Sequence, residues 1–176
     1  ILWAEQVTEG FHARFSATSR TYRYVMHASS ARPAVLSQGI TWVRYPLNTE
    51  LMQDACQYLL GEQDFSAFRG AGCQSNSPYR NITSAKIVKL GQLVVFEVSA
   101  NAFVLHMVRN IVGSLMEVGF ARQSPQWISQ LIAGKDRCKS AATASPNGLY
   151  LVDVDYPEGF AIASLERGPL FLPSSL

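Results

Sequence analysis

The longest regular pattern of apolar positions in this sequence lies between Ala102 and Phe120. Two adjacent sets of apolar side chains recur there every three or four residues: Phe103, Met107, Ile111, Leu115 and Val118, and beside them Val104, Val108, Val112 and Met116. This spacing is that of an α-helix, and two neighbouring apolar stripes leave only a narrow polar face. The pattern therefore predicts a helix that is largely buried.

Arg109 lies in the middle of this predicted core helix. A guanidinium group cannot lose its charge, so burial would require a carboxylate or phosphate partner. The alternative is that the side chain extends along the helix and places its charge at the surface. The pattern alone favours the second alternative, because most helical arginines are exposed.

Shorter patterns predict the other elements of the chain. Alternation of apolar and polar positions predicts strands, and a period of three to four residues bounded by capping residues predicts helices. In chain order these are a strand at 21–26, a short extended piece at 39–45, a helix from 48 to 60, strands at 82–90 and 93–99 joined as a hairpin, a helix at 125–134 and a strand at 148–156. Residues 64–80 have no period and predict a long loop, which in compact domains is often functional.

The order of these elements is β-α-β-β-α-β with one extra helix. This is the α+β, ferredoxin-like plan, in which an antiparallel sheet carries two helices on one face and leaves the other face free for a ligand or a second domain. We expect an N-terminal segment at 1–20, the ferredoxin-like domain at 21–157 and an irregular tail at 158–176. Leu170, Phe171 and Leu172 in that tail are available to pack at an interface.

The net charge of +2 over 176 residues is too small to indicate a nucleic-acid-binding protein, but its distribution is uneven. Residues 10–49 contain five arginines and no acidic residue, and residues 65–96 contain four basic residues and again no acidic one. Arginine outnumbers lysine by 11 to 4, and its forked guanidinium suits contacts to phosphate. These features favour a face that binds a polyanion.

Several functional classes find no support in the sequence. Cys56, Cys73 and Cys138 are far apart, which argues against a disulfide framework or a zinc site and favours a reducing cytoplasm. The three histidines show no metal-ligand spacing, and no nucleotide-binding or cofactor motif is present. We find no apolar run of membrane-spanning length and no signal peptide. The chain begins at Ile1, which suggests a piece of a longer protein.

Five separate motifs resemble the TruA family of tRNA pseudouridine synthases. They are Phe-His-Ala-Arg-Phe-Ser-Ala at 11–17 followed by Tyr-Arg-Tyr at 22–24, Asp-Phe-Ser-Ala-Phe-Arg at 64–69, the run from Asn101 to Gly113 with Met-Val-Arg-Asn-Ile-Val-Gly, Gly-Leu-Tyr-Leu at 148–151, and Gly-Pro-Leu-Phe-Leu at 168–172. They occur in the family's order over nearly the whole chain. The chain resembles the C-terminal part of such an enzyme.

The resemblance implies an isomerase without metal or cofactor that converts uridines of the tRNA anticodon stem-loop to pseudouridine. Members of the family act on tRNA as homodimers. An aspartate initiates the reaction, either at the base or at the ribose carbon. The target base must leave its stack, pack on an aromatic ring and be shielded from water.

Residue by residue, the resemblance assigns two positions to the reaction. Tyr22 matches the family tyrosine that packs on the flipped uracil, and Arg109 matches the arginine that pairs with the catalytic aspartate. A fixed cation keeps such a carboxylate ionised and oriented. The loop that carries this aspartate in the family lies upstream of Phe11 and has no counterpart here, so we expect this chain alone to be inactive. None of the remaining aspartates has the motif: Asp54, Asp64, Asp136, Asp153 and Asp155.

Two further segments match regions of the family that contact tRNA. The first is the Phe-His-Ala-Arg-Phe motif, in which Arg14 suits phosphate and His12 suits hydrogen bonding: Phe11, His12, Ala13, Arg14 and Phe15. The second lies in the predicted long loop: Gly72, Cys73, Gln74, Ser75 and Asn76. Phosphate contacts that position an RNA recognised by its shape fit the distribution of arginines.

Two other functions compete with this interpretation. The chain could be a domain that only binds structured RNA or mediates dimerisation, without catalysis. A small-molecule enzyme on a ferredoxin-like scaffold is disfavoured because no nucleophile or cofactor motif is visible. An Arg-Thr-Asp loop in the upstream sequence would identify an enzyme. The absence of such a loop would identify a domain that only binds.

Overall fold

The computed structural model describes residues 4–160, 162–163 and 166–176. Its central sheet contains four long antiparallel strands in the order β6-β1-β5-β4. Their bounds are Ser19–Ala28 for β1, Tyr79–Leu90 for β4, Leu93–Ala100 for β5 and Leu149–Asp155 for β6. The predicted hairpin of β4 and β5 turns at Gly91, whose φ is +60°. The α+β class predicted from the sequence is confirmed.

Two short strands extend this sheet beyond the predicted plan. β2 (Thr41–Val43) pairs with the end of β1 in parallel, so the sheet is not purely antiparallel. β3 (Gly61–Asp64) pairs with β4 and was not predicted, because its Gly-Glu-Gln-Asp sequence has no alternation of apolar residues. Its position depends on the backbone pairing and on Gln63, which donates hydrogen bonds to the carbonyls of Tyr58 and Leu60 at 3.0 and 2.8 Å.

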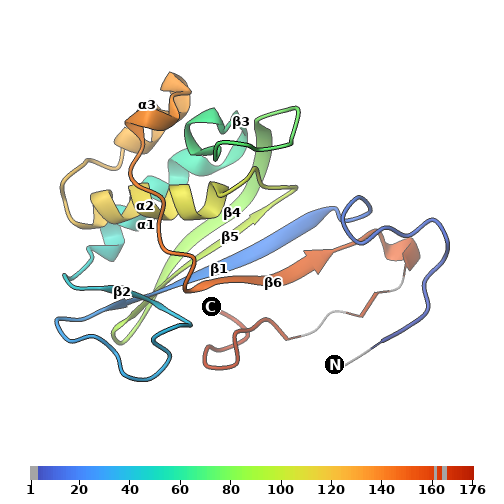
Figure 1. The fold of residues 1–176 in the computed structure, drawn as a ribbon, viewed down its shortest axis with the longest axis horizontal. Coiled ribbons are helices and arrows are strands. Elements are labelled where there is room, and N and C mark those ends of the chain that lie inside the picture. Colours follow the sequence, from blue (N-terminus) through green and yellow to red (C-terminus); the bar gives the residue numbers. More distant parts are fainter. Residues whose placement is uncertain (1–3, 161, 164–165) are drawn as a thin grey trace.

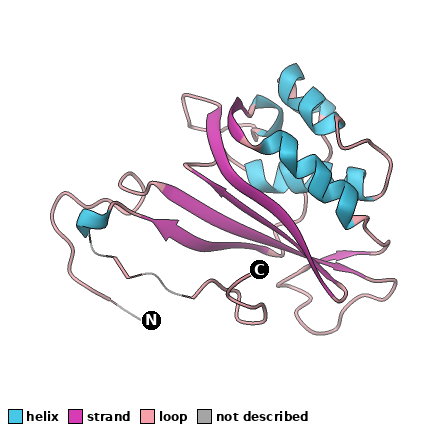
Figure 2. Ribbon diagram, turned by 180° about the vertical axis from the view of Figure 1, so that it is seen from behind, coloured by secondary structure: helices cyan, strands magenta, loops and turns pink. Residues whose placement is uncertain are grey.

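The three helices lie together on one side of the sheet (Figures 1 and 2). They are α1 (Thr49–Cys56), α2 (Met107–Gly119) and α3 (Trp127–Gly134). Asn48 caps α1 as predicted, accepting hydrogen bonds from the backbone of Glu50 and Leu51. The backbone of Asn48 also donates to Gly119 at the end of α2, which ties the two helices together.

The predicted bounds of two helices were wrong. α1 ends at Cys56 and continues as a single 3-10 turn over Gln57–Leu59. The core helix begins at Met107 and not at Ala102. His106 has a left-handed backbone, with φ at +59°, and this conformation ends the right-handed helix at its N-terminal side.

Alternation along β1 divides its side chains between two layers, as the sequence predicted. Tyr24 and Met26 face the helices and belong to the main core with residues of α1 and α2. Val25 faces away and packs in a second, smaller core with Val95 of β5. The strand is therefore buried on both faces from Arg23 to Met26.

The second face of the sheet is not free, because the C-terminal tail covers part of it (Figures 1 and 2). Leu172 is buried against Val25 and Val95, and the ring of Phe171 lies 6.0 Å from that of Tyr150. Leu170, in contrast, is fully exposed. The packing predicted for this part of the tail thus occurs within the chain itself.

Arg23 of β1 fixes this tail, a role that the sequence analysis missed. The side chain has no exposed surface, and its Nε donates to Oε2 of Glu97 at 2.7 Å. Its other nitrogens donate to the backbone carbonyls of Gly168, Pro173 and Ser174 at 2.9, 2.8 and 2.7 Å. Lys86 lies 3.1 Å from the second oxygen of Glu97 and adds to the network.

The connection from α3 to β6 passes directly over α2. Residues 141–147 of this connection are referred to below as the 141–147 segment. A Cβ atom on Gly113 would lie only 2.1 Å from the carbonyl oxygen of Ala142, so the backbone of the segment approaches α2 as closely as a glycine permits. The Tyr24 hydroxyl donates to the carbonyl of Ser145 at 2.8 Å and holds the segment from the sheet side.

Glu97→Gln is expected to lower the free energy of unfolding at neutral pH by about 3 kcal/mol, because Arg23 would stay buried without a carboxylate. Burial by itself would raise the pKa of Glu97, but hydrogen bonds from Arg23 and Lys86 hold it below its ordinary value of 4.5. The contribution of the ionised Glu97 carboxylate to the free energy of unfolding is therefore present above pH 4.5 and is lost as the pH falls through the lowered pKa.

Urea unfolding at a series of pH values measures both effects. The difference between Glu97→Gln and the parent protein should shrink in acid. Glu117→Gln is the matched control, since its ion pair with Arg122 is exposed, and it should cost no more than about 0.5 kcal/mol. Equal losses in the two variants would contradict the role assigned to Glu97.

Gly113→Ala is expected to lower the free energy of unfolding by about 3 kcal/mol, because the new methyl group displaces the backbone at Ala142. Gly134→Ala at the end of α3 is the control, since no atom lies within 4 Å of its Cβ position apart from its chain neighbours and the backbone of its own helix. That variant should be neutral or up to about 1 kcal/mol more stable. Thermal or urea unfolding of both variants compares them directly.

Candidate nucleic-acid interface

Two hollows meet at Tyr22 on the helix side of β1. The inner hollow has a volume of about 210 Å³ and is lined by Tyr22, Phe103, Val104, His106, Met107, Val108, Arg109, Pro146 and Leu149. The outer hollow has a volume of about 820 Å³ and shares Tyr22, Phe103, Val104 and His106 with the inner one. The two predicted active-site residues, Tyr22 and Arg109, therefore line the same small, mostly apolar space.

Tyr22 forms one wall of the inner hollow. Phe103 packs edge-on against its ring, with the ring centres 5.1 Å apart and the planes at 87°. Burial raises the pKa of the Tyr22 phenol, and the nearby Arg20 opposes this only in part. The phenol is therefore neutral at physiological pH and offers a flat apolar surface with a polar tip.

Arg109 reaches the inner hollow from the first turn of α2 and is partly buried. Its Nε donates to the carbonyl oxygen of Ala144 at 2.8 Å. No carboxylate lies within ion-pair distance of it among the described residues. The guanidinium of Arg109 is held by a backbone carbonyl. The alternatives drawn from the helical pattern were a carboxylate or phosphate partner and an exposed charge, and neither anticipated this contact.

No aspartate or glutamate lines the inner hollow, as far as the structure describes the chain. Two of the aspartates considered from the sequence are engaged elsewhere. Asp64 lies 3.1 Å from Lys135 and accepts hydrogen bonds from Ser66, and Asp153 lies 2.8 Å from Arg167. The arrangement can hold a planar uncharged ring beside a cation, but this chain places no carboxylate there.

The Phe11–Phe15 motif forms a tight turn near the end of β6. Phe11 packs on the rings of Tyr156 and Phe160, with ring centres 5.0 and 5.2 Å apart. The carbonyl of Ala13 accepts a hydrogen bond from the Tyr156 hydroxyl at 2.9 Å. Phe11 and Ala13 thus anchor the turn and do not line either hollow.

The other residues of the turn face outward or brace it. Nδ1 of His12 accepts hydrogen bonds from the backbone of Arg14 and Phe15 at 3.1 and 3.3 Å, so this nitrogen is already used within the turn. Arg14 and Phe15 both line the outer hollow, and the Phe15 side chain is 76% exposed. The guanidinium of Arg14 lies 5.7 Å from the centre of the Phe15 ring, which presents a charge and a stacking surface together.

The predicted loop at 72–76 contributes to the wall of the outer hollow. Four of its five residues line that space: Gly72, Cys73, Gln74 and Ser75. Asn76 is exposed and does not line it. Arg69 supports the loop by donating to the carbonyls of Cys73 and Ser75 at 3.0 and 2.6 Å.

The outer hollow is basic. Arg14, Arg20 and Arg80 line it, and none of the described residues that line it is acidic. Arg20 also joins two segments of its lining, because it donates to the carbonyl of Asn101 at 2.7 Å and to that of Arg14. Such a surface suits a phosphodiester backbone, which arginine binds through paired hydrogen bonds.

Several residues that line these hollows were missed from the sequence. Phe103 and Leu149 look like ordinary core positions, and Pro146 lies in a stretch without a pattern. Arg20 and Arg80 are isolated arginines in segments of otherwise neutral residues. The absence of acidic residues around these two arginines was the only feature of the sequence that pointed to a binding surface there.

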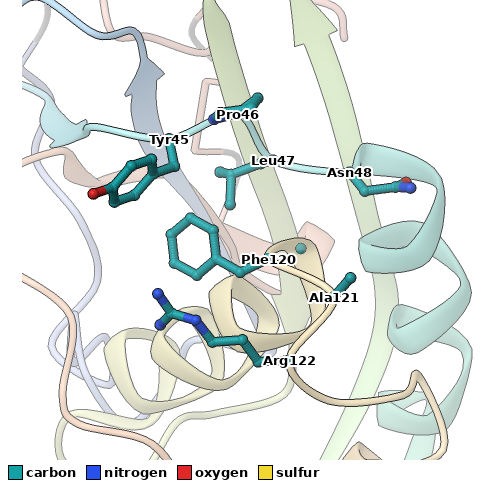
Figure 3. A pocket seen from close by; sticks show the side chains of 8 residues that line it. Tyr45, Pro46, Leu47, Asn48, Phe120, Ala121 and Arg122 are labelled. Carbon is teal, nitrogen blue, oxygen red and sulfur yellow. The ribbon is translucent and has the colours of Figure 1, made fainter.

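A further hollow of about 520 Å³ lies where the residues before α1 meet the end of α2 (Figure 3). Tyr45, Leu47 and Phe120 line it, and the guanidinium of Arg122 lies 4.7 Å from the centre of the Phe120 ring. None of the residues predicted to bind tRNA or uridine contributes to it. It is therefore separate from the site described above.

The described part of the chain was also searched for two other kinds of feature. No helix there has the length and hydropathy to span a lipid bilayer. No group of three or more histidine, cysteine, aspartate or glutamate side chains within it could hold a metal ion.

Comparisons with known proteins agree on one family. Residues 55–157 match the profile described as tRNA pseudouridine synthase. The tRNA pseudouridine synthase A of Shewanella amazonensis is 50% identical over 173 residues, which covers 98% of this chain and 66% of that protein. The enzymes of the same name from Mannheimia succiniciproducens and Klebsiella pneumoniae are 52% and 54% identical and cover 100% and 98% of this chain.

The chain spans about two thirds of the length of these relatives, since it covers between 64% and 67% of the three proteins. The profile alone matches more than half of the chain, and it includes β4, β5, α2, α3 and β6. The similarity extends over the strand that carries Tyr22 and the helix that carries Arg109. This chain belongs to the tRNA pseudouridine synthase family.

Proposed function

We propose that this chain is the part of a tRNA pseudouridine synthase that holds the target uridine of the anticodon stem-loop and orients a catalytic aspartate supplied from outside it. The observation that carries this proposal is the shared lining of the inner hollow by Tyr22 and Arg109. Its opening toward a basic, acid-free outer hollow supports tRNA as the substrate.

In this reaction the bond between N1 of uracil and C1′ of the ribose breaks, the ring turns, and a bond forms between C5 and C1′. The proton on C5 leaves, and N1 gains one, so no cofactor or metal is required. Tyr22 offers a ring on which the extruded uracil packs, and Phe103 holds that ring edge-on. The apolar lining from Val104, Met107 and Leu149 excludes water from the turning base.

Arg109 acts on the carboxylate. Its Nε is engaged by the carbonyl of Ala144, so the two Nη groups remain to form a forked contact with the aspartate. A carboxylate next to this cation stays ionised, as is needed whether it attacks the base or the ribose carbon. Outside the inner hollow, Arg14, Arg20 and Arg80 position the phosphates on either side of the extruded nucleotide.

The proposal extends to the assembly and location of the full-length protein. We infer that it acts as a homodimer in the cytoplasm, as its resemblance to the TruA family implies. Sedimentation of the full-length protein with and without tRNA tests the assembly. A monomeric complex with one tRNA would contradict it.

The test of the activity is tritium release from tRNA that carries 5-tritiated uridine, because the C5 proton leaves only when the new carbon–carbon bond forms. The full-length protein should release tritium, and the 176-residue chain alone should not. Binding of tRNA without release by the full-length protein would favour a non-catalytic RNA-binding domain. Release by the short chain would assign the reaction to one of its own aspartates.

Arg109→Ala in the full-length protein should lower kcat by about a thousandfold, because an interaction with the reacting carboxylate is lost. The Kd for tRNA should stay within about threefold, since Arg109 does not line the outer hollow. Arg122→Ala, an exposed arginine in an ion pair with Glu117, is the matched control and should keep its turnover. Full turnover of Arg109→Ala would remove this residue from the site.

Arg14→Ala should weaken tRNA binding. It should also reduce the slope of log Kd against log salt by the amount that corresponds to about one phosphate contact. Filter binding at several salt concentrations measures this slope. Arg44→Ala is a suitable control, because Arg44 lies within the same acid-free stretch of the sequence but lines neither hollow. An identical slope for Arg14→Ala and the parent protein would assign Arg14 to the structure of the turn alone.

A further inference from the structure

The orientation of Arg109 depends on one residue of the 141–147 segment. Ala144 contacts Arg109 twice: its carbonyl accepts from the side-chain Nε at 2.8 Å, and its backbone N–H donates to the carbonyl of Arg109 at 3.2 Å. The side-chain bond uses Nε, the nitrogen of the guanidinium that is attached to the rest of the side chain. The position of the Ala144 carbonyl therefore decides where the two Nη groups point.

A polar cluster around the buried Asn110 holds the neighbouring residue in place. The Thr143 hydroxyl donates to Oδ1 of Asn110 at 2.7 Å, and Nη2 of Arg137 donates to both of them, at 2.9 and 3.0 Å. Nδ2 of Asn110 donates to the carbonyl of Phe68 at 2.7 Å. Asn110 has no exposed surface, so its amide is fixed from both sides.

This cluster connects the orientation of Arg109 to three other parts of the fold. Asn110 follows Arg109 on α2, Thr143 precedes Ala144, and Arg137 belongs to the turn after α3. Arg137 also donates to the carbonyl of Ala141 at 3.0 Å and so holds the start of the segment. Neither Thr143 nor Asn110 lines the inner or the outer hollow.

We propose that Thr143 and Asn110 are positioning residues for Arg109: they fix the Ala144 carbonyl, which in turn aims the guanidinium into the inner hollow. The inference deepens the proposed function and rests on it for its catalytic consequence. An arginine has several rotatable bonds, and the reaction requires its fork to face the carboxylate within a fraction of an ångström. A set of hydrogen bonds around the buried Asn110, at residues that line neither hollow, supplies this precision.

Thr143 provides the sharper test, because it is exposed and its replacement should not prevent folding. Thr143→Val keeps the shape of the side chain and removes the hydroxyl, which leaves Asn110 with one hydrogen-bond donor fewer. Thr143→Ser keeps the hydroxyl and removes a methyl group. The two variants differ in the one group that the proposal invokes.

The first measurement follows Arg109 directly and does not depend on activity. In full-length protein labelled with [¹⁵N]arginine, the Nε–H signal of Arg109 is identified by its absence in Arg109→Ala. Thr143→Val should exchange this hydrogen at least about tenfold faster than the parent protein, since a mobile Ala144 carbonyl releases it. Thr143→Ser should stay within about threefold. Equal exchange in Thr143→Val and the parent would overturn the proposal.

The second measurement is pseudouridine formation by the same proteins. Thr143→Val should lower kcat about tenfold with KM and tRNA affinity within about twofold, and Thr143→Ser should restore kcat. A fall in melting temperature without a change in kcat would assign Thr143 to stability alone and overturn its positioning role. If the parent protein forms no pseudouridine, the proposed function fails, while the exchange of the Arg109 hydrogen still decides whether Thr143 orients that side chain.

Discussion

The close approach of two backbones at Gly113 and Ala142 is the constraint on which the site depends. Because Gly113 has no side chain, the 141–147 segment lies directly on α2 and brings the carbonyl of Ala144 within reach of Arg109. The same segment places Pro146 in the lining of the inner hollow and leads into β6, whose first residue, Leu149, also lines it. One missing methyl group thus determines both the direction of the cation and the shape of the space it faces.

The site separates two tasks that would interfere with each other in one pocket. The outer hollow is large and basic, which suits the proposed contacts to phosphates, whereas the inner hollow is small and mostly apolar. Tyr22 lines both hollows, so its ring lies where they meet. Among the described residues that line the inner hollow, Arg109 is the one arginine or lysine, and its Nε is bound by a neutral carbonyl and not by a carboxylate.

The sequence predicted the features that depend on local pattern. Alternation along β1 identified its two faces, and Asn48 marked the beginning of α1. The motifs of the family placed Tyr22 and Arg109 together, although no pattern could show that a carbonyl from residue 144 holds the arginine. β3 and the late start of α2 were missed, because backbone pairing and the left-handed His106 leave no trace in the spacing of apolar residues. Arg23 was missed for a similar reason, since its partners lie far away along the chain.

The network around Arg23 also has a consequence for how the protein is made. Arg23 is synthesised early, but the carbonyls of Gly168, Pro173 and Ser174 that complete its hydrogen bonds follow 145, 150 and 151 residues later. A nascent chain on the ribosome cannot satisfy this buried guanidinium until those residues have emerged. A product cut short by premature termination would lack these acceptors and the tail itself, and it would leave Val25 and Val95 without the cover of Leu172, which would lower its stability and favour its degradation. The stability that the Arg23 network contributes is therefore gained only once the tail has been synthesised.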